Sequence, residues 1–310
     1  MDFSSINPAL LVAALMVSST PILLAALGEM VVERAGVLNL GVEGMMIMGA
    51  VTGFVVGFNT EIPALGFIAA AAASAVFALI FGFLTQILLS NQVATGLGLT
   101  LVGLGLSALI GKPYEGMKAP TLPKLDFGPL GDIPFFGRVL FGHDAMVYLS
   151  LLLVAVVWYV LRSTRIGLIL RAVGENHDAA HSLGYKVVRI RLAAIAFGGA
   201  CAGLGGAYLS LVRLPQWTEG MTAGAGWIAL AIVVFASWRA GRVLVGAYLF
   251  GGLTVLQLNL QAAGMTAGVQ YLSMSPYLIT ILVLVLITSG RFKGAHNAPA
   301  SLGRLFEVTR

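Results

Sequence analysis

The chain has 310 residues, of which 58% are apolar and only 10% are charged, with a mean hydropathy of +0.94. Soluble domains carry about 25% charged residues, so this composition excludes a soluble globular protein and indicates an all-α polytopic membrane protein. The net charge of +5 is concentrated in a few loops, so it marks topology and does not suggest nucleic-acid binding. We expect one transmembrane domain over 1–310.

Apolar segments recur along the whole chain and predict about eight to ten transmembrane helices. Several are shorter than the ~20 residues needed to cross a bilayer, so some are expected to be broken or to extend further. The nine segments are roughly 8–27, 42–58, 62–89, 93–110, 145–161, 192–212, 224–238, 243–263 and 276–289.

The segment 28–44, GEMVVERAGVLNLGVEG, mixes glutamates, an arginine and an asparagine with apolar residues and glycines. Irregular backbone at membrane depth survives only where protein buries it or water reaches it. We therefore predict a broken or re-entrant stretch that lines a translocation path, with a plain cytoplasmic connection as the alternative.

Glycines recur every four residues in two apolar segments. This spacing predicts close helix contacts through small-residue faces. The glycines are Gly49, Gly53, Gly57, Gly199 and Gly203.

Loop charges predict which segments share a side of the membrane. The loop 112–144 is long and net neutral, so we expect it outside. The loop 162–191 holds six basic and two acidic residues, and further basic residues follow in 239–242 and in the tail 290–310. Because cytoplasmic loops are rich in Lys and Arg, these three are expected inside. An odd number of spans then places the N-terminus outside and the C-terminus in the cytoplasm.

The basic loop 162–191 also contains a predicted short helix. Asn176 can cap its start, and Gly184 can end it in a left-handed conformation. Ala179, Ala180 and Leu183 would form one small apolar face, surrounded by His177, Asp178 and His181. Such a helix suits docking into a groove of a soluble partner, while a solvated loop helix is the alternative.

Catalytic and metal-binding motifs are missing from the sequence. Gly111-Lys112 is followed by Pro113, so it is no phosphate-binding loop, and neither GxSxG nor HExxH occurs. His177 and His181 are expected to face water and to bind no metal. We therefore expect no enzyme activity in this chain.

The substrate is expected to be neutral and polar. Acidic and basic residues are absent from the interiors of the third to ninth segments, which argues against an ion-coupled secondary transporter, the rival class. Trp217 and Trp238 are expected in the interfacial belt. Amide, hydroxyl, carboxylate and aromatic groups that could line the pathway are Asn39, Glu43, Asn91, Gln92, Thr100, Trp227, Gln257 and Asn259.

Four long motifs carry a family resemblance. They are GVLNLGVEGMMIMGA, NQVATGLGLTLVGLG, RAVGENHDAAHSLG and FGGACAGLGGAYLS, in this order. With these motifs the chain resembles the membrane permeases of bacterial ABC importers, in the branched-chain amino acid/ribose-type family. The stretch 214–238, LPQWTEGMTAGAGWIALAIVVFASW, is similar to the branch for purine nucleosides and simple sugars.

The resemblance implies a permease half in the bacterial inner membrane, importing nucleosides, with ribose-like sugars or branched-chain amino acids as alternatives. The implied partners are a longer sister permease, ATPase subunits that hold ATP and magnesium, and an external substrate-binding lipoprotein. No cofactor is expected in this chain. His177 and Asp178 depart from the Pro or basic residue usual in the family. The implied ATPase-coupling residues are Gly174, Glu175, Asn176, Ala179, Ala180, Leu183 and Gly184.

Overall fold

The computed structural model describes residues 8–131, 133–262 and 298–307, together with residues 274, 278, 281, 282 and 285. No β-strand occurs in these residues, and seven helices are long and apolar enough to cross a membrane, which confirms the all-α polytopic class. The long helices are α1 (Pro8–Arg34), α2 (Val42–Thr60), α3 (Pro63–Gln86), α4 (Gln92–Gly111), α6 (Ala145–Ser163), α9 (Val187–Tyr208) and α11 (Ala240–Ala262).

Shorter helical elements connect the long ones. α9 continues into a π-helical turn, and two 3₁₀ turns lie in the loop after α4. The shorter elements are η2 (Lys112–Tyr114), η3 (Gly128–Leu130), α5 (Phe136–Leu140), α7 (Arg165–Glu175), α8 (His177–Ser182), η4 (Leu209–Arg213) and α10 (Ala225–Phe235).

Two predicted segments differ from the observed helices. α1 continues beyond the predicted end at residue 27 to Arg34, so its 27 residues span about 40 Å, more than the ~30 Å of a bilayer core. The predicted segment 224–238 contains only the 11 residues of α10, which span about 16 Å and cannot cross a bilayer. The ninth predicted segment, 276–289, lies outside the continuously described residues.

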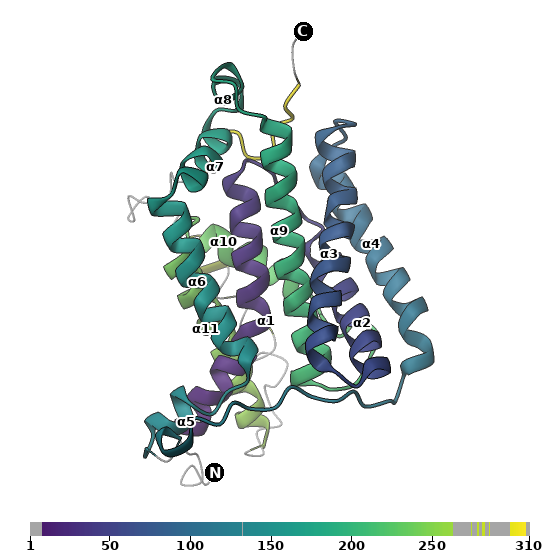
Figure 1. The fold of residues 1–310 in the computed structure, drawn as a ribbon, viewed down its shortest axis with the longest axis vertical. Helices are drawn as coiled ribbons and strands as arrows, with labels where there is room; N and C mark the ends of the chain where they lie inside the picture. The colour runs from purple at the N-terminus through teal and green to yellow at the C-terminus, as the bar shows by residue number, and fades with distance from the viewer. Residues whose placement is uncertain are drawn as a thin grey trace.

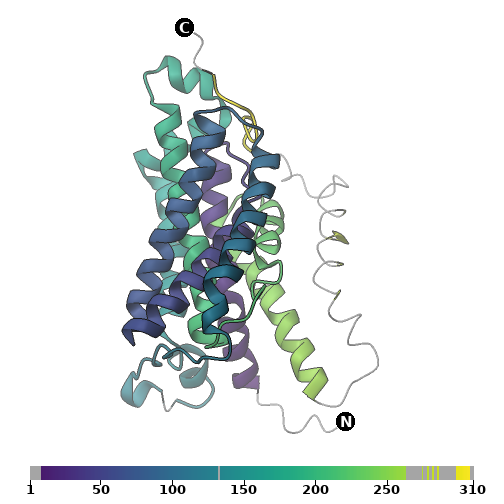
Figure 2. The ribbon, with the colours of Figure 1, turned by 90° about the vertical axis from the view of Figure 1, so that its right-hand side faces the viewer.

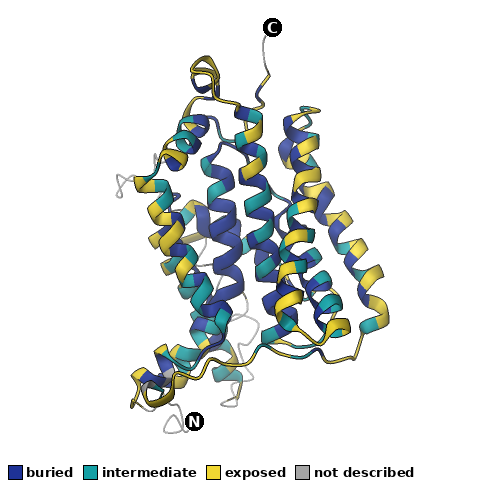
Figure 3. Ribbon diagram, in the orientation of Figure 1, coloured by how far each residue is buried: buried dark blue, intermediate teal, exposed yellow. Residues whose placement is uncertain are grey.

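The core of the bundle is formed by α1, α2 and α9, with α3 packed against α2 and α9 (Figure 1). Burial concentrates on these central helices, whereas α3, α4 and α6 turn exposed faces outward (Figure 3). The predicted glycine faces are confirmed, because a Cβ atom on Gly49 would collide with the backbone of Gly203. Glycine at position 49 therefore lets α2 approach α9 this closely, whereas a Cβ atom on Gly203 would collide with Ala70 and Ser74 of α3.

The two ends of the bundle carry different loops. α5 and the rest of loop 112–144 lie at one end, and α7, α8 and residues 298–307 lie at the other (Figures 1 and 2). α1 begins at the α5 end. Arg162, Arg239 and Arg242 line one hollow at the α8 end, so the basic loops share a side as predicted. Arg291, Lys293 and Arg310 of the predicted basic tail lie outside the described residues.

Candidate functional site

The short helix predicted in the loop 162–191 is present as α8, and its start is capped as expected. The Asn176 side-chain oxygen accepts hydrogen bonds from the backbone N–H groups of Asp178 (3.1 Å) and Ala179 (3.0 Å). At the other end Gly184 has a φ of +88°, the left-handed conformation that favours glycine. Both local signals therefore gave the correct boundaries of this turn.

The predicted apolar face of α8 is only partly correct. Ala180 is buried (2% exposed), while Leu183 (77% exposed) and Ala179 face solvent. His177, expected in water, is also buried, and its ring packs edge-on against Phe306 at a centroid distance of 5.3 Å. His181 is exposed as expected. The inner face of α8 is thus occupied by the chain itself, so Ala180 is not free to contact a partner.

A buried arginine connects α8 to the rest of the bundle. Arg191, at 0% exposure near the start of α9, donates from Nη2 to His177 Nδ1 (3.2 Å). Its other nitrogens donate to the carbonyl oxygens of Ala35 and Arg304 and to Gln86 Oε1, each at 3.2 Å. One side chain therefore joins α8 to the ends of α1 and α3 and to the tail. The sequence did not indicate this buried role, because Arg191 is simply the last basic residue of the predicted cytoplasmic loop.

The segment 298–307 is bonded to the junction of α7 and α8. Ser301 donates its backbone N–H to Gly174 O (2.9 Å) and its hydroxyl to Glu175 O (3.2 Å). Gly303 N–H donates to Gly36 O (3.2 Å), beyond the end of α1. Of the predicted coupling residues, Gly174 is therefore buried against the chain, whereas the side chains of Glu175 and Asn176 are exposed.

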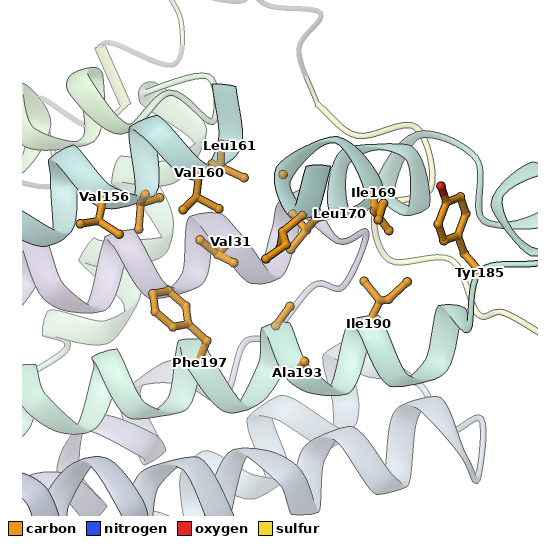
Figure 4. A pocket seen from close by; sticks show the side chains of 14 residues that line it. Val31, Val156, Val160, Leu161, Ile169, Leu170, Tyr185, Ile190, Ala193 and Phe197 are labelled. Carbon is orange, nitrogen blue, oxygen red and sulfur yellow. The ribbon is translucent and has the colours of Figure 1, made fainter. Parts of the chain in front are cut away.

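An apolar hollow of about 460 Å³ lies beneath α7. Side chains from α1, α6, α7 and α9 point into it, and Leu170, Ile190 and Phe197 are among them (Figure 4). A tightly packed α7 would leave no such volume. α7 therefore lies over space and not over a filled core.

The stretch between α1 and α2 is irregular and buried, as predicted, although only 35–41 is non-helical. Leu38 N–H donates to Gln92 Oε1 (2.8 Å) at the start of α4, and Thr100 Oγ1 donates to Leu40 O (3.3 Å) two turns further on. The two contacts are eight residues apart on α4, which is about 12 Å along its axis. The segment thus runs into the depth of the bundle before α2 begins.

Asn39 and Glu43, both predicted to line the pathway, are committed to structural hydrogen bonds. Asn39 Oδ1 accepts from Gly41 N–H (2.9 Å), which closes a local turn before α2. Glu43 accepts from the Thr222 hydroxyl (2.5 Å) and from the N–H groups of Gly224 (2.9 Å) and Gly226 (2.7 Å). These groups belong to the start of α10, so the Glu43 carboxylate caps a helix from elsewhere in the chain.

The remaining predicted pathway residues do not form one site. Asn91 caps α4 at an exposed position, and Trp227 is 49% exposed on α10. Gln257 and Asn259 lie near the far end of α11. Gln92 and Thr100 therefore bond the backbone of the buried segment that contains Asn39 and precedes Glu43, and none of the other four residues shares these contacts.

The belt assignment of Trp217 and Trp238 is wrong, because both are buried. Trp238 has a φ of +55°, which strains a bulky residue, and its indole N–H donates to Glu33 Oε2 (2.5 Å). Arg34 donates to the carbonyl oxygen of Trp238 (3.0 Å). These contacts stabilise the turn that follows α10. The apolar segment 224–238 gave no indication of this turn, because the turn depends on contacts with the distant residues of α1.

Metal binding is not supported in the part of the chain that is described. No group of three or more His, Cys, Asp or Glu side chains that could hold a metal ion occurs there.

Comparisons with known proteins give a consistent family. The family described as branched-chain amino acid transport system permease component matches residues 11–288. TsgC13 of Haloferax volcanii, which carries the provisional name of a glucose ABC transporter permease protein, is 44% identical over 86% of this chain and 88% of its own. The guanosine ABC transporter permease protein NupQ of Bacillus subtilis is 34% identical over 95% of both chains. A second Haloferax volcanii protein, the glucose ABC transporter permease protein TsgB13, is 29% identical over 90% of this chain and 76% of its own. No solved structure matches the chain.

Proposed function

The chain belongs to the family of branched-chain amino acid transport system permease components, and from this premise we propose that it is the membrane half of an ATP-driven importer of nucleosides. Membership makes it a transport subunit of the sugar and nucleoside type and not an enzyme. The likeness to NupQ over 95% of both chains supports a nucleoside as the substrate.

A neutral substrate is supported by the engagement of the buried carboxylates. Glu29 accepts from Asn39 N–H (3.3 Å), Glu33 from the Trp238 indole, and Glu43 from three donors at the start of α10. A buried carboxylate already bonded inside the protein is a poor partner for a cationic substrate or coupling ion. This engagement is the observation that carries the proposal of a neutral solute.

Coupling to ATP hydrolysis would pass through α8. The surface offered to an ATPase subunit consists of exposed residues of α8 and of the positions that flank it, namely Glu175, Asn176, Ala179, Leu183 and Gly184. Behind this surface Arg191 and Phe306 tie α8 to the bundle, so a push on α8 would move α1, α3 and α9 together. The hollow beneath α7 leaves room for such a movement.

The partners follow from the same proposal. ATP and magnesium would be held by separate ATPase subunits, and an external lipoprotein receptor would deliver the substrate. Because TsgC13 and TsgB13 come from one organism and both resemble this chain, a longer sister permease would complete the pathway. The α8 end would face the cytoplasm and the N-terminus the outside of a bacterial inner membrane.

Glucose is the second candidate, favoured by the 44% identity to TsgC13. The test is uptake of radiolabelled guanosine and glucose into proteoliposomes that hold the complete complex. ATP-dependent, vanadate-sensitive guanosine uptake that excess unlabelled glucose does not reduce is the expected result. Uptake of glucose but not of guanosine would identify glucose as the substrate. Uptake driven by an ion gradient without ATP would contradict the proposal of an ATP-driven importer.

A further inference from the structure

A strongly basic hollow of about 550 Å³ opens at the α8 end of the bundle. Side chains from the ends of α1, α6 and α7 and from the α10–α11 turn converge on it, although these elements are far apart in the sequence. Two tryptophans, Trp158 and Trp238, lie in its wall. The arginines that line the hollow are Arg34, Arg162, Arg171, Arg239 and Arg242.

No carboxylate of the described residues pairs with the arginines of this hollow. The lining contains no acidic residue, and none of the five arginines forms an ion pair with an acidic residue of the described chain. Glu175 acts electrostatically on Arg34 without pairing with it, and the Glu33 carboxylate accepts from the indole N–H of Trp238. The sequence from 263 to 297, most of which is not described, contains no Asp or Glu that could supply a negative charge.

Three of the arginines have partners that leave their charge in place. Arg34 and Arg171 donate to carbonyl oxygens, of Trp238 (3.0 Å) and Gly167 (3.3 Å) respectively. The Arg162 guanidinium stacks over the Trp158 ring at 5.3 Å. Arg239 and Arg242 are exposed and make no side-chain hydrogen bond among the described residues. The preference of basic residues for the cytoplasmic side of a membrane explains why the five arginines lie at one end of the bundle. It does not explain why they converge on one hollow.

The ligand chemistry that matches this hollow is a phosphate group. Guanidinium groups bind phosphate oxygens in a bidentate manner, and several arginines together can hold one phosphodiester. Basic pockets between transmembrane helices at a membrane surface are suited to anionic lipid headgroups.

The surroundings of the hollow favour a lipid over a soluble anion or a protein partner. From Arg242 an exposed apolar stripe runs down α11 through Val245 (66% exposed), Leu249 (43%) and Leu256 (49%). An acyl chain could follow this stripe while its headgroup stays between the arginines. Trp158 in the wall is 48% exposed, and exposed tryptophan side chains are typical of the membrane–water interface. α8, the proposed docking surface for an ATPase, contributes no residue to the hollow.

We propose that this hollow binds the headgroup of an anionic phospholipid, with its acyl chains along α11. The proposal goes beyond the transport function and does not depend on the identity of the substrate.

The test uses the full chain in dodecyl maltoside micelles and the quenching of its tryptophan fluorescence by brominated phosphatidylglycerol. Wild type should show saturable quenching, and brominated phosphatidylcholine at the same mole fraction should quench far less. The double variant R239Q/R242Q should weaken the apparent affinity for phosphatidylglycerol about thirtyfold, because each basic residue at a membrane surface contributes to anionic lipid binding. The variant R239K/R242K should retain most of the affinity, since it keeps both charges.

R165Q/R189Q is the matched control, because both arginines are exposed at the same end but lie outside the hollow. It should bind phosphatidylglycerol as the wild type does. Equal quenching by both lipids, or unchanged affinity in R239Q/R242Q, would overturn the proposal. Displacement by inorganic phosphate at constant ionic strength would instead identify a free-anion site. If R239Q/R242Q lost co-purification with the ATPase while its quenching stayed unchanged, the hollow would be a protein interface. Either this result or displacement by phosphate would overturn the proposal of a lipid site.

Discussion

The Nη2 atom of Arg191 lies 3.2 Å from Nδ1 of His177, and the guanidinium can only donate in this contact. The His177 ring must therefore accept at Nδ1 and carry its proton on Nε2, which lies 3.6 Å from Asp178 Oδ1. A neutral histidine is thus the form that joins α8 to the bundle.

Arg191→Lys should loosen the attachment of α8 although it preserves the charge. Lysine cannot reach four acceptors on different elements as the guanidinium fork does, so buried carbonyls would lose their donors. We expect a loss of about 3 kcal/mol in stability, measured as a lower apparent Tm of the purified full chain. Arg189→Lys, at the exposed neighbouring arginine, should leave Tm unchanged. Equal Tm values for both variants would contradict the role of Arg191.

The attachment of α8 should weaken in acid. Burial and then the nearby Arg191 charge lower the pKa of His177 from its ordinary value of about 6.5. Because the folded-state pKa is depressed, the stabilising effect is fully present above pH ~6.5 and is lost as the pH falls through the lowered pKa. The apparent Tm of the wild type should therefore fall more between pH 7.5 and 5 than that of His177→Gln. His181→Gln, at an exposed position, should follow the wild-type profile; a wild-type profile in His177→Gln would contradict this account.

Leu183 and Ala180 should respond differently to the same charge. Leu183→Glu changes an exposed side chain, so we expect an unchanged Tm but a loss of about tenfold or more in substrate-stimulated ATPase activity of the reconstituted complex. Ala180→Glu would bury a carboxylate against Phe306 and Val173, so it should lower Tm as well. Normal stimulation in Leu183→Glu would exclude this surface from docking.

Glu43→Gln should destabilise the chain even though it is nearly isosteric. The carboxylate accepts from three donors, whereas an amide offers one oxygen and would point its NH₂ group at further donors. We expect a loss of about 2 kcal/mol, seen as a lower apparent Tm. Glu61→Gln, at the exposed opposite end of α2, is the control and should have little effect.

Gly49→Ala should separate α2 from α9. The added Cβ would collide with the Gly203 backbone, and overpacking of this kind costs about 1–3 kcal/mol. The matched change Gly98→Ala on α4 meets no atom within 4 Å, so it should be neutral or slightly stabilising. If Gly49→Ala were as stable as Gly98→Ala, the close contact between α2 and α9 would be wrong.

Local signals in the sequence predicted the features that depend on neighbouring residues. The cap by Asn176, the left-handed Gly184 and the close-packing glycines all follow from short patterns. The apolar runs likewise identified the long helices, although α1 extends further because Glu29 and Glu33 are satisfied by partners that hydropathy does not register.

The features that were missed or wrongly predicted depend on contacts between segments that are distant in the sequence. Nothing near Arg191 indicates that Ala35, Gln86 and Arg304 surround it. The end of α10 is set by the contact of Trp238 with Glu33, about 200 residues earlier in the sequence. The orientation of α8 was predicted from its own residues, but Phe306 from the tail decides which side is covered.

The position of Phe306 has a consequence for biosynthesis. Phe306 follows all the described helices in the chain, so during translation the inner face of α8 stays uncovered until the segment 298–307 has been made. A nascent chain in which α1 to α11 are complete therefore still exposes Ala180 and His177, which this segment later covers.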